Sequence, residues 1–231
     1  MTEYRTIAAP ATASFVEKKS EFIAYLAPVR TAEEAVSVIE TVRKNHRRAR
    51  HNVYAYLLRE GNASRYSDDG EPQGTAGMPV LDVLQKKELT DICCVVTRYF
   101  GGVLLGSNGL VRAYSHSTSL AIEQAKVQIM LPCYPVSLQA DYSLYGKIAY
   151  ALPKTDLIQK NVTFEDQVRM KLLVRDTILP ELQKQLIDLT GNQIQLQIGD
   201  KEYADFFPAV TGIPEKFQSL FRIFLCADFR A

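Results

Sequence analysis

Cysteine is scarce in this chain of 231 residues, and tryptophan is absent. The four cysteines have no CxxC spacing and no pattern typical of a disulfide framework, so they suit a reducing cytosol. None of the three histidines has the HExxH spacing of a zinc enzyme or lies near a cysteine at metal-ligand spacing. We therefore expect no metal centre and no cofactor. The adjacent Cys93 and Cys94 are expected to be inert core thiols.

An excess of charge of one sign is also missing. The chain has 27 Lys and Arg residues against 26 Asp and Glu residues, which gives a net charge of +1. A protein so close to neutrality has no global field that would recruit nucleic acid. Any binding of nucleic acid would have to use a local patch of basic side chains.

Long apolar runs are missing as well. No segment approaches the roughly 18 apolar residues of a membrane-spanning helix. The opening MTEYRTIAAPATASF lacks the basic and apolar regions of a signal peptide. With 47% hydrophobic and 23% charged residues, the composition is that of a soluble globular protein with a real core. We expect a cytoplasmic protein that does not contact a membrane.

The hydrophobic pattern predicts an α+β fold with two domains, 1–132 and 133–231, divided near the prolines of MLPCYPVS. In the first domain, a helix begins after the N-cap Thr31, and the almost continuously apolar DICCVVTRY indicates a strand buried on both faces. The other predicted elements are two extended pieces that meet near 18–21, a strand at 52–58, a long loop at 59–74, a helix from about 75 and a helix from 107 to about 126.

The second domain has a clear order of elements: strand, helix, strand, strand, helix, strand. This βαββαβ order is the ferredoxin-like arrangement, and Gly191 follows the second helix as a stop signal. The segment after it, 207–229, suggests a closing helix. The six predicted elements are 136–142, 143–152, 156–164, 167–174, 180–189 and 193–198.

The stretch VVTRYFGGVLLGSNGLVRAY (95–114) contains the most informative motif. Arg98 and Tyr99 end a buried strand, and the two glycines that follow permit a positive φ or a close backbone approach. Ser107 and Asn108 are placed to cap the next helix, whose N–H groups form a potential anion site. The motif predicts a pocket for phosphate or a backbone, although a tight turn in which Arg98 pairs with a carboxylate would use the same residues.

An acidic loop, SDDGEPQGTAG, holds Asp68, Asp69 and Glu71 within four residues. Such carboxylates can bind Mg²⁺ or act as acid and base, which would make an enzyme if the loop faces Arg98. The structural alternative is a turn whose carboxylates cap the helix beginning near 75 or pair with Arg98 or Arg112. The sequence alone leaves both interpretations open.

A basic run, RKNHRRARHN, contains five cations between positions 43 and 50 and no acid. Cations at a helix C-terminus complement the dipole, which explains Arg43 and Lys44. The continuation through Arg47, Arg48 and Arg50 exceeds what helix capping requires. It favours contacts with phosphate groups of a nucleic acid.

The pair of blocks YSDDGEPQGTAGMPVL and VVTRYFGGVLLGSNGLVRAY resembles the IMPACT family, and RARHNVYAY also fits it. The chain as a whole is similar to the bacterial YigZ/YvyE branch of that family. The resemblance implies an N-terminal domain like the second domain of a small-subunit ribosomal protein and domain IV of elongation factor G. It implies a C-terminal domain like domain V of that factor. Eukaryotic relatives regulate translation by binding an activator of a stress-responsive kinase, a partner not expected in bacteria.

Together these observations predict a non-catalytic regulator of translation that binds RNA or the ribosome through a basic, glycine-rich surface. The alternatives are an enzyme, either a hydrolase or a phosphate-ligand-binding one, with loop 68–71 opposite Arg98, and a protein–protein interaction module. No catalytic residue is assigned. The predicted nucleic-acid-binding residues are Arg43, Lys44, Arg47, Arg48, Arg50, His51, Arg98, Tyr99 and Arg112. The predicted ligand or anion pocket comprises Asp68, Asp69, Glu71, Gly101, Gly102, Ser107 and Asn108.

Overall fold

The computed structural model describes residues 3–153 and 156–206 of the chain. It divides into two compact units, Tyr4–Gln128 and a C-terminal unit from Ile129 onward that also takes in the first residues. This division falls four residues before the predicted one. The prolines of MLPCYPVS lie inside one long strand, β7 (Val127–Ala140), rather than in a linker. The predicted closing helix at 207–229 lies outside the described residues.

The N-terminal unit is built on an antiparallel sheet of five strands in the order β2-β3-β6-β4-β5. The central strand β6 is buried along almost its whole length, as its continuous apolar sequence predicted. The edge strand β5 lies within the predicted loop 59–74, so that expectation was wrong there. The bounds are β2 (Ala11–Glu17), β3 (Ser20–Pro28), β6 (Ile92–Tyr99), β4 (His51–Leu57) and β5 (Ser64–Ser67).

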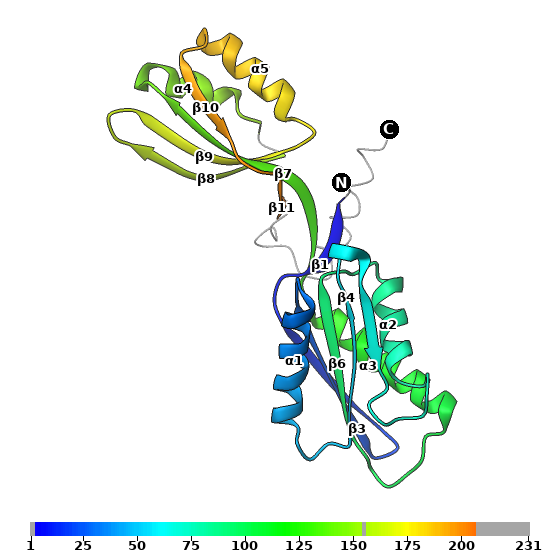
Figure 1. The fold of residues 1–231 in the computed structure, drawn as a ribbon. Coiled ribbons are helices and arrows are strands. Elements are labelled where there is room, and N and C mark those ends of the chain that lie inside the picture. Colours follow the sequence, from blue (N-terminus) through cyan, green and yellow to red (C-terminus); the bar gives the residue numbers. More distant parts are fainter. Residues whose placement is uncertain (1–2, 154–155, 207–231) are drawn as a thin grey trace. The chain divides into compact units, whose positions relative to one another are not determined.

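Helices cover both faces of this sheet (Figure 1). On one face α1 (Ala32–Asn45) packs against β4 and β6, and Thr31 caps it as predicted, its hydroxyl accepting from the Glu34 N–H. On the other face α2 (Gly77–Lys86) and α3 (Ser107–Gln124) cover the larger core. A 3₁₀ turn, η1 (Glu60–Asn62), and the short strand β1 (Tyr4–Ile7) complete the unit.

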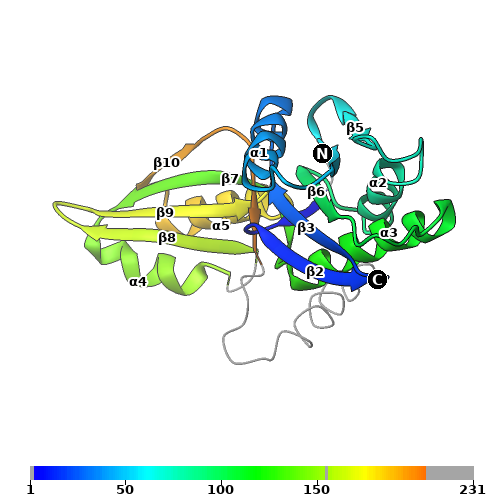
Figure 2. The ribbon, with the colours of Figure 1, turned by 90° about the horizontal axis from the view of Figure 1, so that it is seen from below.

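The C-terminal unit confirms the predicted βαββαβ order. Figure 2 shows its antiparallel strands side by side in the order β10-β7-β9-β8. The two helices share one face, where Ile148, Leu182 and Leu186 pack on alternate residues of the strands. A further strand, β11, was not predicted and pairs with β7. The bounds are α4 (Tyr142–Ala151), β8 (Leu157–Phe164), β9 (Val168–Arg175), α5 (Leu179–Thr190), β10 (Ile194–Ile198) and β11 (Glu202–Asp205).

Candidate functional site

Three strand ends meet at one end of the N-terminal sheet. In the antiparallel register, Arg98 near the end of β6 lies opposite His51, the first residue of β4. On the other side of β6, Tyr99 lies opposite Glu21 at the start of β3. The segments that flank these strands, namely the β2–β3 turn, the basic run and the glycine loop 100–106, therefore gather at the same end of the sheet.

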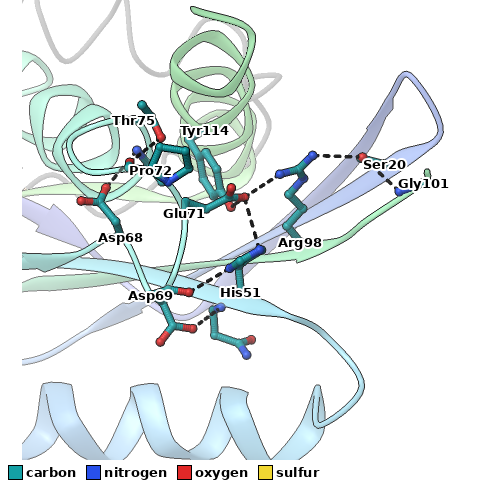
Figure 3. A network of polar contacts seen from close by, with 12 residues as sticks. Ser20, His51, Asp68, Asp69, Glu71, Pro72, Thr75, Arg98, Gly101 and Tyr114 are labelled. Carbon is teal, nitrogen blue, oxygen red and sulfur yellow. Dashed lines mark hydrogen bonds and ion pairs between the residues drawn. The ribbon is translucent and has the colours of Figure 1, made fainter. Parts of the chain in front are cut away.

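A buried ion pair lies at the centre of this end (Figure 3). The Arg98 Nη1 donates to the Glu71 Oε1 at 2.7 Å, and these side chains are only 6% and 5% exposed. The Tyr114 hydroxyl of α3 donates to the same oxygen at 2.8 Å. Burial raises the pKa of the Tyr114 phenol, and the Glu71 carboxylate beside it raises that pKa further. Glu71 thus joins the acidic loop, β6 and α3 in one network.

The backbone around Arg98 is packed closely on the β2–β3 turn. The Ser20 hydroxyl accepts from the Arg98 Nη2 at 3.4 Å and from the Gly101 N–H at 3.2 Å. A Cβ on Gly101 would lie 2.0 Å from the backbone carbonyl of Lys19, so only glycine fits there. The guanidinium also stacks over the rings of Phe22 and Phe100. Arg98 is consequently fixed inside the domain rather than presented on its surface.

The two aspartates of the acidic loop are satisfied by the backbone and by α1. Asp68 accepts from the N–H groups of Gly74, Ala76 and Gly77, and so holds the turn that leads into α2. Asp69 accepts from the Asn52 N–H and from the Arg43 guanidinium, both at 2.6 Å. These contacts agree with the structural interpretation of the loop, in which its carboxylates cap a helix and pair with arginines.

His51 is held in a defined orientation between this loop and Glu71 (Figure 3). Its Nδ1 lies 2.9 Å from the Asp69 carbonyl oxygen. Because a carbonyl oxygen can only accept, the Nδ1 carries the proton. The Nε2 then lies 4.0 Å from the Glu71 Oε1, too far for a hydrogen bond. In the neutral ring this nitrogen presents a lone pair.

A cavity of about 410 Å³ opens beside the ion pair, within the size range of small-ligand pockets. Its polar lining comes from Arg50, His51, Glu71, Arg98 and Ser107, and the rest is mainly apolar. The acidic loop and Arg98, whose spatial relation the sequence left open, therefore share one cleft. Of the predicted pocket residues, Glu71 and Ser107 line this cavity. The apolar part of the lining is formed by Pro72, Phe100, Leu104, Leu105, Gly106 and Leu110.

The start of α3 borders the cavity without a side-chain cap. Gly106, with φ 72° and ψ 165°, occupies the N-cap position, and Ser107 is the first helical residue. The expectation that Ser107 and Asn108 would cap this helix was wrong, because the positive φ places glycine at that position. The first N–H groups of α3 are thus free of the competing side-chain oxygen that a Ser or Asp cap would supply.

The basic run separates into engaged and exposed residues. Arg43 pairs with Asp69, and the Tyr99 hydroxyl is bound to the His46 Nδ1 at 2.9 Å. The side chains of Arg47, Arg48 and Arg50 form no ion pair with any of the described residues. The exposed members of the predicted nucleic-acid-binding set are Arg43, Lys44, Arg47, Arg48, Arg50 and Arg112.

Several residues of this end were not identified as a site from the sequence. Lys18 and Lys19 form the β2–β3 turn with φ of 45° and 66°, and both are exposed beside the glycine loop. Ser20 and Tyr114 complete the buried network, yet each is distant in sequence from Arg98 and Glu71. No local signal could have found these partners, because only strand pairing and helix packing bring them together.

The thiols of Cys93 and Cys94 lie in the core and are not among the residues that line the cavity. Burial raises the pKa of Cys94 to about 12 and also raises that of Cys93. Both side chains face the core, which explains why a reactive role is unfavourable. Within residues 3–153 and 156–206, no three His, Cys, Asp or Glu side chains are grouped in a way that would hold a metal ion. No helix in those ranges is long and apolar enough to cross a membrane.

Comparison with known proteins matches both units. Residues 18–122 match the Impact N-terminal domain, and residues 138–193 match a domain of unknown function (DUF1949). The chain is 34% identical to the IMPACT family member YvyE of Bacillus subtilis (strain 168) over 87% of its own length and 94% of that protein. It is 35% identical to the IMPACT family member YigZ of Escherichia coli (strain K12) over 82% and 94% of the two lengths.

Similarity also extends to a eukaryotic relative and to a solved structure. The Protein IMPACT homolog of Dictyostelium discoideum is 40% identical, over 45% of this chain and 30% of that protein. The solved structure titled "Crystal structure of an hypothetical protein" is 33% identical, covers 87% of this chain and 98% of its own, and superposes with a TM-score of 0.57.

Proposed function

This chain belongs to the IMPACT family, and we propose that it is a non-catalytic regulator of translation that binds RNA, free or in the ribosome, with its N-terminal unit. The observation that carries the proposal is the group of exposed cations at the end of the sheet where β6 finishes. Arg47, Arg48 and Arg50 lie there without a carboxylate partner in the described part of the chain. Unpaired surface arginines are the residues that phosphate groups recruit most readily.

The β2–β3 turn enlarges this basic surface. Lys18 and Lys19 project from the turn that packs against Gly101, so they lie at the same end of the sheet as the basic run. Glu17 and Glu21 flank them, but the five cations outnumber these two acids. The patch is therefore locally positive although the whole chain carries a net charge of only +1.

Apolar side chains lie beside the cations, as single-stranded RNA requires. Phe100 is 44% exposed and Leu104 is 83% exposed, and both line the cavity together with Arg50. Bases that are splayed out of a strand stack on aromatic and apolar side chains while cations hold the backbone. A cavity that combines Arg50, Phe100 and the uncapped start of α3 offers both kinds of contact.

The enzyme alternative has less support from the same geometry. Asp68 and Asp69 are engaged by backbone N–H groups and Arg43, which leaves neither free for Mg²⁺ or proton transfer. Glu71 is tied to Arg98 and Tyr114. The acidic loop acts as a framework for the cavity, so binding explains its contacts better than hydrolysis does.

The test is binding of a single-stranded RNA oligonucleotide and of purified ribosomes at two salt concentrations. We expect affinity to fall steeply with salt, since each phosphate contact releases a counterion. The double variant Arg47→Ala/Arg48→Ala should bind less tightly, and its plot of log K against log salt should be flatter by about 1 to 2.

The matched control is Lys86→Ala/Lys87→Ala, which removes the same charge from the same unit. These exposed lysines precede the start of β6 instead of following its end, so this variant should keep the affinity of the parent. If both double variants lost the same RNA affinity, the effect would be one of net charge alone. The proposal that RNA binds at the basic run would then be rejected. Salt-insensitive capture of a protein, with no RNA binding at low salt, would instead favour a protein–protein module.

A further inference from the structure

Glu71 offers the cavity an acceptor that no protein group uses. Its side chain is 5% exposed, and its bonds from Arg98 and Tyr114 both go to the Oε1. No donor among residues 3–153 and 156–206 bonds to its Oε2, although Glu71 lines the cavity. This oxygen is not one of the buried polar atoms that lack a partner, so it is reached from the cavity. A donor on a ligand in the cavity can therefore bind it.

His51 offers a second acceptor to the same cavity. Its Nδ1–H is fixed by the Asp69 carbonyl, so the Nε2 of the neutral ring can only accept. No hydrogen bond to this Nε2 is found among the described residues, and His51 lines the cavity beside Glu71. Two acceptors on one wall select for a ligand that brings an O–H or N–H group.

The rest of the lining favours an anion instead. Arg50 contributes an unpaired cation, and the uncapped start of α3 contributes free N–H groups next to Gly106 and Ser107. An isolated phosphate would gain from these groups but would meet the negative Glu71 across the same space. The cavity is therefore suited to a ligand with a hydroxyl donor next to a phosphate.

We propose that the cavity holds the ribose of a ribonucleotide within an RNA strand, with the 2′-hydroxyl donating to the Glu71 Oε2 or the His51 Nε2 and a neighbouring phosphate facing Arg50 and the start of α3. This inference rests on the RNA binding proposed above and specifies which part of the RNA the cavity binds. The 2′-hydroxyl is the group that distinguishes RNA from DNA. Phe100 and Leu104 supply the apolar wall for the sugar or its base.

A consequence is discrimination against deoxyribose. DNA of the same sequence would leave the acceptor that the 2′-hydroxyl uses without its donor after the ligand has displaced water, and sites built for a hydroxyl reject ligands that lack it. A 2′-O-methyl group keeps the ribose geometry but removes the donor. Both replacements should weaken binding by about tenfold or more, the size of one lost hydrogen bond to a charged or buried group.

The experiment compares three single-stranded oligonucleotides of one sequence, made of RNA, DNA and 2′-O-methyl RNA, at one low salt concentration. The parent protein should prefer RNA over both others by about tenfold. The variant that removes the acceptor of the hydroxyl, His51→Phe or Glu71→Gln, should lower the ratio of RNA affinity to DNA affinity toward one. The control His46→Phe, which removes a histidine bonded to Tyr99 and outside the cavity lining, should retain the preference.

The possible outcomes distinguish failure of the ribose site from failure of RNA binding itself. If the parent binds RNA, DNA and 2′-O-methyl RNA equally well, the ribose site is rejected and RNA binding stands. If the preference persists in both folded cavity variants, the 2′-hydroxyl is read elsewhere and the site is again rejected. If no oligonucleotide binds at low salt, the proposed function fails together with this inference. Thermal melting of each variant shows that it is folded, and His51→Phe serves alone if Glu71→Gln does not fold.

Discussion

Two charged loops flank the same sheet end in the N-terminal unit, and they differ in how their charges are satisfied. In the acidic loop, Asp68, Asp69 and Glu71 each accept hydrogen bonds from backbone or side-chain donors. In the basic run, Arg47 and Arg48 are exposed and form no ion pair within the described residues. One loop shapes the domain, and the other remains available to a partner.

The difference shows that a cluster of charges does not by itself indicate a binding site. Burying a charge is costly unless it is paired and hydrogen-bonded, so carboxylates that enter the fold must find donors there. Exposed arginines carry no such requirement, because water already solvates them. Because no carboxylate among the described residues neutralises them, Arg47 and Arg48 remain available for the RNA contacts proposed above.

The largest expected effect is on the stability of the buried network. Replacing Glu71 by Gln leaves Arg98 buried without its counter-charge, and breaking one side of a buried ion pair costs about 3–5 kcal/mol. Urea unfolding followed by circular dichroism would measure this loss. The control Arg48→Ala should unfold like the parent, within about 0.5 kcal/mol. Equal stabilities of Glu71→Gln and the parent would show that the acidic loop contributes no more to folding than the exposed arginines do.

A smaller loss is expected for Asp68→Asn. The carboxylate accepts from three N–H groups at the entrance to α2, and an amide side chain has only one oxygen to offer. Losing such a cap costs about 1–2 kcal/mol. The same unfolding measurement applies, with Asp166→Asn in the exposed turn between β8 and β9 as control. An unchanged midpoint for Asp68→Asn would show that the loop is held by other contacts.

The smallest effect is a pH dependence of stability. Burial raises the pKa of Cys94 to about 12 from 9.0, and the pKa of Cys93 is also raised. The unfolded chain therefore releases these protons first, so stability is full well below pH 9 and falls as the pH rises through it. Between pH 8 and pH 9 the two thiols should cost under about 1 kcal/mol together.

Circular dichroism melts of the parent and of Cys93→Ala/Cys94→Ala at these two pH values test this expectation. The double variant should lose less stability between them than the parent does. An identical loss in both proteins would assign the alkaline effect to other groups. Tyr114, whose pKa is raised by burial and by Glu71, should add a further loss only above about pH 10.

The fold class and the order of elements could be predicted from local features of the sequence. The spacing of apolar residues in the C-terminal half predicted the βαββαβ order. Apolar residues recur at every second position in a half-buried strand but at about every 3.6 positions in an amphipathic helix, so the two elements can be distinguished. The apolar run of β6 and the N-cap Thr31 were equally readable, since both depend on residues that are close in sequence. The strand β5 was missed, because the short edge segment 64–67 has little buried surface to show a pattern.

The assembly of the candidate site could not be predicted, because its residues are distant in the sequence. Glu71 and Arg98 are 27 residues apart, and Tyr114 is 43 residues from Glu71. Each of these three residues lies in a motif that the sequence analysis identified. The motifs did not specify which carboxylate would be buried or which arginine would stay exposed. The burial of each charged side chain depends on strand register and helix packing. These determine which charged groups come close enough to pair, and how large a cavity remains beside them.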